Sequence, residues 1–250
     1  MTATIPILAF HAIEEGPAPL CIPPEVFTRQ IRALASSGCR ALTVSEVAAF
    51  VGRGEPFPER AVALTFDDGY ASTLRTALPV LAEAGFVASL FPATAALGRA
   101  NGFADGLRML WRSEVLELRA AGWEIGGHTH THRPLPALKP KEMATEISRS
   151  TGILEDLTGE PVRSFAFPYG RHDAASRALA ASMYDCCLAI GAARVTGRSR
   201  LEALERVDAW YARRPGITVR LHGRVGGAYL ATRRLVRAVA EPVRRLRGEP

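Results

Sequence analysis

Two adjacent aspartates, Asp67 and Asp68, are the first residues of this 250-residue sequence whose pattern indicates chemistry. They lie in the motif Thr-Phe-Asp-Asp-Gly, directly after the apolar run AVAL, which predicts a buried strand. Adjacent carboxylates at a strand end point in different directions, so one can ligate a metal ion while the other takes a proton from water. A turn that caps a helix is the alternative without chemistry.

Three histidines within five residues form the second pattern. His128, His130 and His132 lie in Gly-Gly-His-Thr-His-Thr-His, after a short predicted strand. In a helical turn, His128 and His132 would share one face, whereas in an extended segment all three would face one side. Two histidines and one carboxylate leave a coordination position open, as in catalytic metal sites. The aspartate pair favours this interpretation over a surface histidine cluster.

Short apolar runs alternate with amphipathic segments along the whole chain, and this alternation predicts a parallel sheet. A (β/α) barrel is the simplest architecture, with a doubly wound open sheet as the alternative. In such barrels, functional side chains lie where strands end, as both motifs do. The expected strands are Ile5–Phe10, Ala61–Phe66, Phe86–Phe91, Trp123–Gly126, Ser164–Phe167, Cys187–Ile190 and Arg206–Ala209. The expected helices are Pro24–Ser37, Glu46–Val51 capped by Ser45, Ala71–Ala84, Ser113–Ala121, Lys141–Leu157, Ala174–Met183 and one from about Ala228.

The composition is that of a folded globular protein, with 48% hydrophobic and 22% charged residues. We expect one catalytic domain over residues 1–250. No apolar run is long enough to span a bilayer and the first residues do not form a secretory signal, so a cytoplasmic location is expected. The four cysteines have no zinc-binding spacing and are expected to be reduced. Basic and acidic residues are mostly interspersed, so no nucleic-acid partner is expected.

Together, TFDDG, HTHTH and the segment Phe-Ala-Phe-Pro-Tyr-Gly at residues 165–170 resemble the polysaccharide deacetylases of carbohydrate esterase family 4. The resemblance covers roughly Ile5 to Trp210. It implies a distorted (β/α) barrel with fewer than eight strands, which hydrolyses an N-acetyl, or sometimes an O-acetyl, group on a sugar with Zn²⁺ or another divalent ion. The opening Ile-Leu-Ala-Phe-His is similar to the branch that includes poly-N-acetylglucosamine deacetylases.

The same resemblance assigns roles to individual residues. It implies that Asp68, His128 and His132 are the metal ligands and that Asp67 is the general base. The hydroxyl of Thr129 would brace the metal-binding loop. The backbone N–H of Tyr169 would help to hold the oxyanion.

The chain departs from the family pattern at two points. Where many members have an arginine that orients the base, this chain has Ala166, and Arg163 and Arg206 are the candidate substitutes, of which Arg206 is preferred. The general acid would be a histidine, either His11 after the first strand or His222 near the C-terminus. We favour His11, because in the resembling branch the catalytic histidine comes first in the chain.

The implied substrate is an acetylated glycan or amino sugar. Trp111, Trp123 and Trp210 are each expected to pack in the core, and only Trp210, near a late strand end, is a candidate for substrate contact. Two alternatives are a hydrolase of small cyclic amides or imides on the same fold and a catalytically silent glycan-binding barrel. Because Asp67, Asp68 and both ligand histidines are present, the sequence favours an enzyme.

A basic helix is expected over residues 228–247. Its apolar positions recur at helical spacing, and Pro242 should kink or end it. We expect this helix to close the barrel, with its apolar stripe on the core and its arginines in solvent. The alternative is that its basic face rests on the anionic inner face of a membrane. The arginines are Arg233, Arg234, Arg237, Arg244, Arg245 and Arg247, against the single acid Glu241. The sequence makes no prediction of the oligomeric state.

Overall fold

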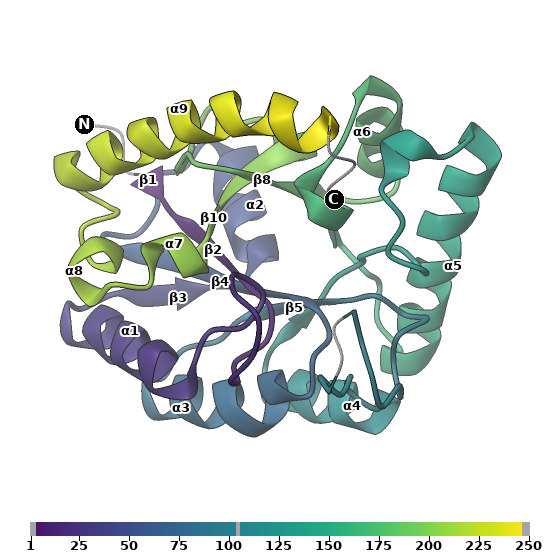
Figure 1. Ribbon diagram of the computed structural model, residues 1–250, viewed down its shortest axis with the longest axis horizontal. Helices are drawn as coiled ribbons and strands as arrows, with labels where there is room; N and C mark the ends of the chain where they lie inside the picture. Colours follow the sequence, from purple (N-terminus) through teal and green to yellow (C-terminus); the bar gives the residue numbers. More distant parts are fainter. Residues whose placement is uncertain (1–3, 104–105, 247–250) are drawn as a thin grey trace.

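The computed structural model describes residues 4–103 and 106–246. Seven parallel strands curve into a nearly closed barrel, in the order β6-β5-β4-β2-β10-β8-β7 (Figure 1). A parallel bridge between Gly127 and Phe165 joins the two ends of this order. The barrel with fewer than eight strands is therefore confirmed, and the open sheet is not formed. The strands are β2 (Ile7–Phe10), β4 (Ala61–Asp68), β5 (Ser89–Pro92), β6 (Glu124–Ile125), β7 (Ser164–Ala166), β8 (Cys186–Gly191) and β10 (Leu204–Asp208).

Three further strands lie outside this path. β3 (Arg40–Leu42) pairs with the first residues of β4, and β1 (Thr4–Ile5) pairs antiparallel with β9 (Val195–Thr196). The predicted strand Ile5–Phe10 is divided at Pro6, which has no N–H to donate to a neighbouring strand. β3 and β9 were not predicted, because two or three residues are too few to show a periodicity.

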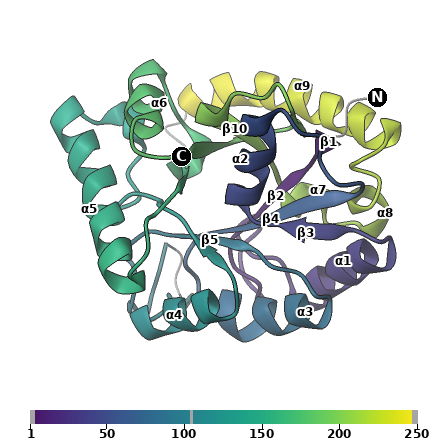
Figure 2. The same ribbon diagram turned by 180° about the vertical axis from the view of Figure 1, so that it is seen from behind.

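Helices surround the barrel on all sides (Figures 1 and 2). Ser45 does not cap a helix as predicted: Thr43 is the N-cap of α2, in a capping box with Glu46, and the Ser45 hydroxyl donates to Glu124. A π-helical turn, Thr73–Ala77, precedes α3. The α-helices are α1 (Pro24–Ser36), α2 (Val44–Arg53), α3 (Leu78–Glu83), α4 (Arg112–Ala120), α5 (Pro140–Thr158), α6 (Ala174–Ala181), α7 (Ala209–Ala212), α8 (Pro215–Thr218) and α9 (Arg224–Leu246).

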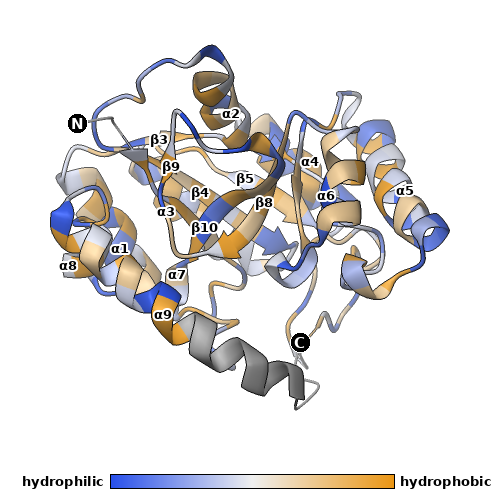
Figure 3. Ribbon diagram, turned by 90° about the horizontal axis from the view of Figure 1, so that it is seen from above, coloured by the Kyte–Doolittle hydropathy of each residue, from blue (hydrophilic) through white to orange (hydrophobic). Residues whose placement is uncertain are grey.

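An aromatic cluster packs between the strands that carry the two motifs and the helices outside them. Figure 3 shows that hydrophobic residues occur along the barrel strands and along the helices around them. The rings of Phe10 and Phe66 stack with centroids 5.1 Å apart, and Trp123 packs on Phe66 at the same distance. The core position expected for Trp123 is confirmed, whereas Trp111 is 53% exposed and its predicted burial is wrong. All four cysteines are free thiols.

The last helix is oriented differently from our expectation. α9 begins one turn earlier than predicted and continues past Pro242 to Leu246. Its apolar residues Val225, Leu235 and Val236 are 62%, 70% and 50% exposed, so the prediction that this stripe packs on the core is wrong for the described side chains. The side chains of Arg237, Arg244 and Arg245, and the whole of Arg247, lie outside the described residues. No helix within the described part of the chain is long and apolar enough to cross a membrane.

Candidate metal and active site

The sequence motifs meet at the carboxyl ends of the barrel strands. Asp67 and Asp68 are the last residues of β4, and His128 follows β6. In the pairing of β2 with β4, Phe10 lies opposite Phe66, so the next residues, His11 and Asp67, lie at the same level. The parallel register thus brings residues from three separate parts of the sequence to one end of the barrel.

Asp68, His128 and His132 form a compact triangle of donor atoms. Asp68 Oδ1 lies 3.3 Å from His128 Nε2 and 3.1 Å from His132 Nε2, and the two Nε2 atoms are 3.2 Å apart. Ligands bound to a tetrahedral ion at about 2.0–2.1 Å are about 3.3 Å apart, so the triangle matches one face of such a site. The three side chains are at most 7% exposed, and within the described chain the buried Asp68 Oδ1 has no hydrogen-bond donor. This donor set can hold one divalent ion.

Three residues at the triad have the left-handed backbone conformation, with positive φ. Asp68, Thr129 and His132 have φ of 69°, 64° and 62°, a region that non-glycine residues rarely adopt. Such residues cost on the order of 1–3 kcal/mol each and cluster at functional sites. The segment from His128 to His132 is therefore neither the helical turn nor the extended strand considered from the sequence. Thr129 Oγ1 accepts a hydrogen bond from the His132 N–H at 3.1 Å and closes the turn.

Hydrogen bonds and charges favour the protonation states in which His128 and Asp68 can bind a cation. His128 Nδ1 lies 2.7 Å from the carbonyl oxygen of Ala166, which can only accept, so Nδ1 carries the proton and Nε2 keeps its lone pair in the neutral ring. Burial alone would raise the pKa of Asp68, but the nearby charge of His132, followed by the close contacts of both imidazoles, holds the pKa well below its ordinary value. Asp68 is therefore a carboxylate, the form that ligates a metal.

Asp67 is held apart from this triangle by Arg206. The two guanidinium Nη atoms donate to the two carboxylate oxygens, each at 2.7 Å, and Nη1 also lies 3.1 Å from Thr65 Oγ1. Arg206 is fully buried, and Asp67 is 3% exposed. Bidentate pairing fixes the plane of the carboxylate as well as its position. Thr65 was not singled out from the sequence, although it belongs to the TFDDG motif.

The charges around Asp67 determine its protonation. Burial raises the pKa of this carboxyl, but the charge of Arg206, followed by that of His128 and the Arg206 hydrogen bonds, lowers it by more. The net result is a pKa below the ordinary value. Asp67 is ionised at neutral pH and carries lone pairs next to the triad.

The two histidines considered for the general acid lie at opposite ends of the barrel. His11 directly follows Phe10, which pairs with Phe66, so His11 lies at the level of Asp67. His222 lies instead 3.6 Å from Cys39 Sγ, just before β3 begins, at the amino ends of the strands. Burial, followed by the charges of Arg194 and Arg60, lowers the pKa of His222 to about 4. Of the two, only His11 is near the candidate metal site.

The remaining candidates are placed as follows. Arg163 pairs with Asp185 on the surface at 3.2 Å and does not replace the arginine missing at Ala166. His130 does not belong to the donor triangle, and its Nδ1 lies 2.9 Å from the hydroxyl of Thr94.

Three aromatic residues lie at this end of the barrel. Tyr169, with φ of 58°, is 40% exposed, and its ring lies 4.6 Å from that of His132. Phe103 approaches His132 at the same distance and is 43% exposed. Trp210 follows β10, half-buried, with the Arg213 guanidinium 3.9 Å above its ring. Phe103 was missed because it lies in an irregular, glycine-rich segment with no periodicity.

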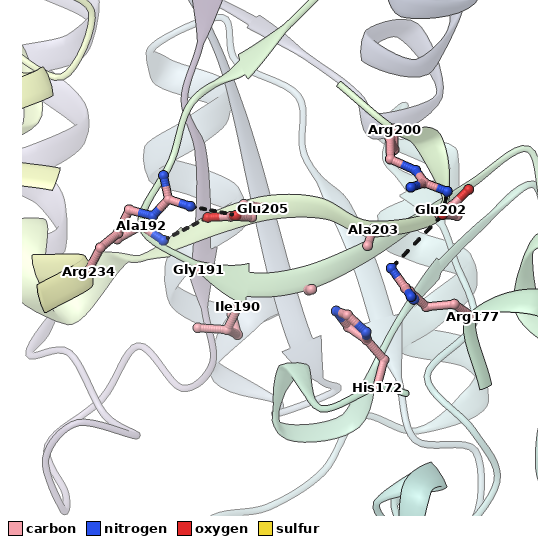
Figure 4. A pocket seen from close by; sticks show the side chains of 11 residues that line it. His172, Arg177, Ile190, Gly191, Ala192, Arg200, Glu202, Ala203, Glu205 and Arg234 are labelled. Atoms are coloured by element: carbon pink, nitrogen blue, oxygen red, sulfur yellow. Dashed lines mark hydrogen bonds and ion pairs between the residues drawn. The ribbon is translucent and has the colours of Figure 1, made fainter. Parts of the chain in front are cut away.

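A separate hollow of about 410 Å³ lies outside the barrel wall, against β8 and β10 (Figure 4). Its charged side chains face one another: Glu202 pairs with Arg200 at 2.5 Å, and Glu205 pairs with Arg234 at 3.5 Å. His172 completes the lining. None of the three residues of the metal triad lines this hollow.

Comparison with known proteins identifies the family. The sequence pattern that defines polysaccharide deacetylases matches residues 54–184, more than half of the chain and the part that includes both motifs. The chain belongs to the polysaccharide deacetylase family. It is 27% identical over 171 residues to the polysaccharide deacetylase homologue YxkH of Bacillus subtilis (strain 168), a match that covers 68% of this chain and 58% of YxkH. It is 34% identical over 82 residues to chitin deacetylase 1 of Cryptococcus neoformans var. grubii, which covers 32% of this chain.

The chain thus spans less than two thirds of each of these relatives, 58% of YxkH and 17% of the chitin deacetylase. Solved structures share the fold over a larger part. The deacetylase PplD of Streptococcus pyogenes, solved with acetate, has a TM-score of 0.76 at 24% identity, over 83% of this chain and 93% of that one. IcaB of Ammonifex degensii has a TM-score of 0.71 at 22% identity, over 87% and 97%. As a polysaccharide deacetylase, the chain therefore has the barrel of this family.

Proposed function

We propose that this polysaccharide deacetylase hydrolyses the N-acetyl group of an acetylated amino sugar or glycan, with a divalent metal ion. One observation carries the proposal: a buried Asp-His-His triangle lies next to a second carboxylate, Asp67, that Arg206 holds apart from it. A metal triad alone could be structural. A neighbouring ionised carboxylate that does not belong to the triad supplies the base that hydrolysis needs.

Asp68, His128 and His132 are the proposed ligands, and Zn²⁺ is the ion we propose, because two imidazoles and a carboxylate in tetrahedral spacing suit it. A divalent ion in this position supplies Lewis acidity toward the acetyl carbonyl and lowers the pKa of water. Three protein ligands leave a coordination position for substrate or water, which distinguishes a catalytic from a structural zinc site.

Asp67 is the proposed general base. It is ionised at neutral pH, and each of its oxygens keeps a lone pair after accepting one hydrogen bond from Arg206. Arg206 is a positioning residue in this scheme: it fixes the direction of those lone pairs. Asp67 accepts a proton from the attacking water, so this proton does not have to be released to bulk solvent.

His11 is the proposed general acid. It follows the neighbouring strand β2, at the level of Asp67. Protonated, it donates to the leaving nitrogen, because an amine anion is too poor a leaving group to depart unprotonated. The backbone N–H of Tyr169 is the proposed hydrogen-bond donor to the acetyl oxygen as negative charge develops there. Trp210, at the end of β10, is the proposed aromatic contact for the sugar.

Acetate release from a panel of N-acetylated amino sugars and oligosaccharides tests the proposal, with and without a chelator. We expect release that the chelator abolishes and added Zn²⁺ restores. Activity on small cyclic amides but on no acetylated sugar would favour the alternative substrate class. Tight metal binding with no hydrolysis of either class would favour a silent glycan-binding barrel and overturn the proposed function.

A further inference from the structure

The solvent-facing stripe of α9 is the surface feature that catalysis at the strand ends leaves unexplained. Val225 and Val236 are eleven residues apart, which is three helical turns, so they share one face, and Leu235 lies beside them. All three are at least half exposed. The sequence continues the same spacing at Val239, Val243 and Leu246. Several large apolar side chains exposed on one face of a helix favour an interaction site over a solvated face.

Contacts on the other side of α9 fix this orientation. Leu230 is buried in the core, and the Arg233 guanidinium lies 3.7 Å above the ring of Tyr211. Arg234 pairs with Glu205 on β10 at 3.5 Å (Figure 4). Figures 1 and 2 show α9 along the outer edge of the barrel, between α8 and α6. The helix therefore turns its core-packed side and two arginines toward the barrel and its apolar stripe toward solvent.

The positive charge of the chain is concentrated in residues 209–250, the segment that includes α9. Residues 209–250 contain 10 of the 31 basic residues but only 2 of the 25 acidic ones, a formal charge of +8. The first 208 residues carry the other 21 basic and 23 acidic residues, a formal charge of −2. Among the described side chains, Arg214, Arg220 and Arg224 are exposed close to the start of α9. The apolar stripe thus lies in the part of the sequence that carries the excess of positive charge, with exposed arginines near the start of the helix.

We infer that α9 binds an anionic lipid surface, with its apolar stripe at the boundary between headgroups and acyl chains and the exposed arginines at its start, Arg220 and Arg224, among the headgroups. An amphipathic helix with an exposed apolar face and flanking arginines has the properties of interfacial helices. Arginine side chains next to such a stripe can extend toward the headgroups while their methylenes stay in apolar surroundings. Each basic residue near an anionic surface adds to the affinity until salt screens it.

A second copy of the chain fits this surface less well. A two-fold dimer through α9 would place the same residues of both copies against each other. Two segments of formal charge +8 would then meet, and their repulsion would oppose the apolar contact. An anionic lipid surface, in contrast, can bury the apolar stripe and attract the positive charge.

Co-sedimentation with vesicles tests the inference on the full chain. We expect binding to vesicles of phosphatidylcholine with phosphatidylglycerol, weaker binding as NaCl is raised, and little binding to phosphatidylcholine alone. The double variant Leu235→Gln, Val236→Gln should bind anionic vesicles at least about tenfold more weakly, because two exposed apolar side chains are lost without a change of charge. Arg220→Gln with Arg224→Gln should also weaken binding by about tenfold or more and reduce its dependence on salt.

Leu116→Gln is the matched control, since Leu116 is 40% exposed on α4, away from α9, and the same amide replaces it. It should bind like the unaltered chain. Far-UV circular dichroism shows whether each variant is folded, and because lipid binding needs no catalysis, this test is independent of the proposed function. Equal binding by the α9 variants and the control would overturn the inference. A dimer in sedimentation equilibrium that the Leu235, Val236 variant dissociates, with no vesicle binding by either protein, would overturn it in favour of a second copy.

Discussion

Arg206 holds Asp67 from a strand that is not its neighbour. β2 lies between β10 and β4 in the barrel, yet both Nη atoms reach the two carboxylate oxygens at 2.7 Å. The guanidinium crosses the interior below the strand ends and also contacts Thr65. The position of Asp67 is therefore fixed by two strands and a buried ion pair rather than by a loop.

A substitution of Arg206 that keeps its positive charge but changes the shape of the side chain tests the role of its pairing with Asp67. A lysine cannot donate two parallel hydrogen bonds to one carboxylate. We expect Arg206→Lys to keep its metal while turnover falls by roughly 10- to 100-fold, because the carboxylate is no longer fixed in plane. Arg206→Ala leaves a buried carboxylate unpaired and should lower the free energy of unfolding by about 3–5 kcal/mol.

Acetate release, elemental analysis and urea unfolding of both variants provide the measurements. Arg163→Lys is the control, because Arg163 is an exposed arginine paired with Asp185 and should tolerate the change. Full turnover in Arg206→Lys would mean that bidentate orientation of Asp67 is not needed for the reaction.

The two adjacent aspartates should separate metal binding from proton transfer. Asp67→Asn removes the proposed base but no ligand, so it should retain the metal and lose roughly 10²–10⁴ in turnover. His128→Ala removes one corner of the donor triangle and should lose both metal and activity. Elemental analysis after gel filtration, together with acetate release, distinguishes the two. If both variants lost the metal equally, the assignment of different roles to Asp67 and Asp68 would be wrong.

The barrel and the meeting of the motifs could be predicted because they depend on simple periodicity. An apolar run such as AVAL before TFDDG is local information, and in a parallel sheet the ends of such runs meet at one edge. Conformation at the histidines was not predictable in the same way. Left-handed φ values at Thr129 and His132 are unfavourable locally, and only the surrounding contacts enforce them.

Contacts between residues far apart in the sequence could not be predicted from the sequence pattern either. Nothing in the residues around Arg206 indicates that its side chain crosses the barrel to Asp67, and it was preferred over Arg163 only through a family resemblance. The periodicity of α9 revealed an apolar stripe but not which side of the helix is buried. That depends on Leu230 and on the contacts of Arg233 and Arg234, which sequence spacing does not show.

His11 should be required for turnover but not for metal binding. If it donates the proton to the leaving nitrogen, His11→Ala should lower turnover by roughly 10²–10⁴ and leave the metal content unchanged. His222→Gln is the matched control, because His222 lies at the amino ends of the strands, beside Cys39. It should retain nearly full activity. Normal turnover in His11→Ala, with loss in His222→Gln, would reverse the assignment.

His222 should instead determine part of the dependence of stability on pH. Its pKa in the folded protein is about 4, because burial and the charges of Arg194 and Arg60 disfavour the charged ring, whereas an unperturbed histidine has a pKa of 6.5. Between these values the unfolded chain binds more protons at this position than the folded chain does. The contribution of neutral His222 is therefore complete above about pH 6.5 and is lost progressively as the pH falls toward 4.

His222→Gln removes this titration and keeps a neutral polar side chain of similar size. Urea unfolding of both proteins from pH 7 to pH 4 measures the difference in unfolding free energy between them. We expect the unaltered chain to lose more stability than the variant over this range, because protonation of His222 favours its unfolded state. A difference that stays constant from pH 7 to pH 4 would show that His222 titrates alike in both states, and that burial next to Arg194 and Arg60 does not disfavour its charge.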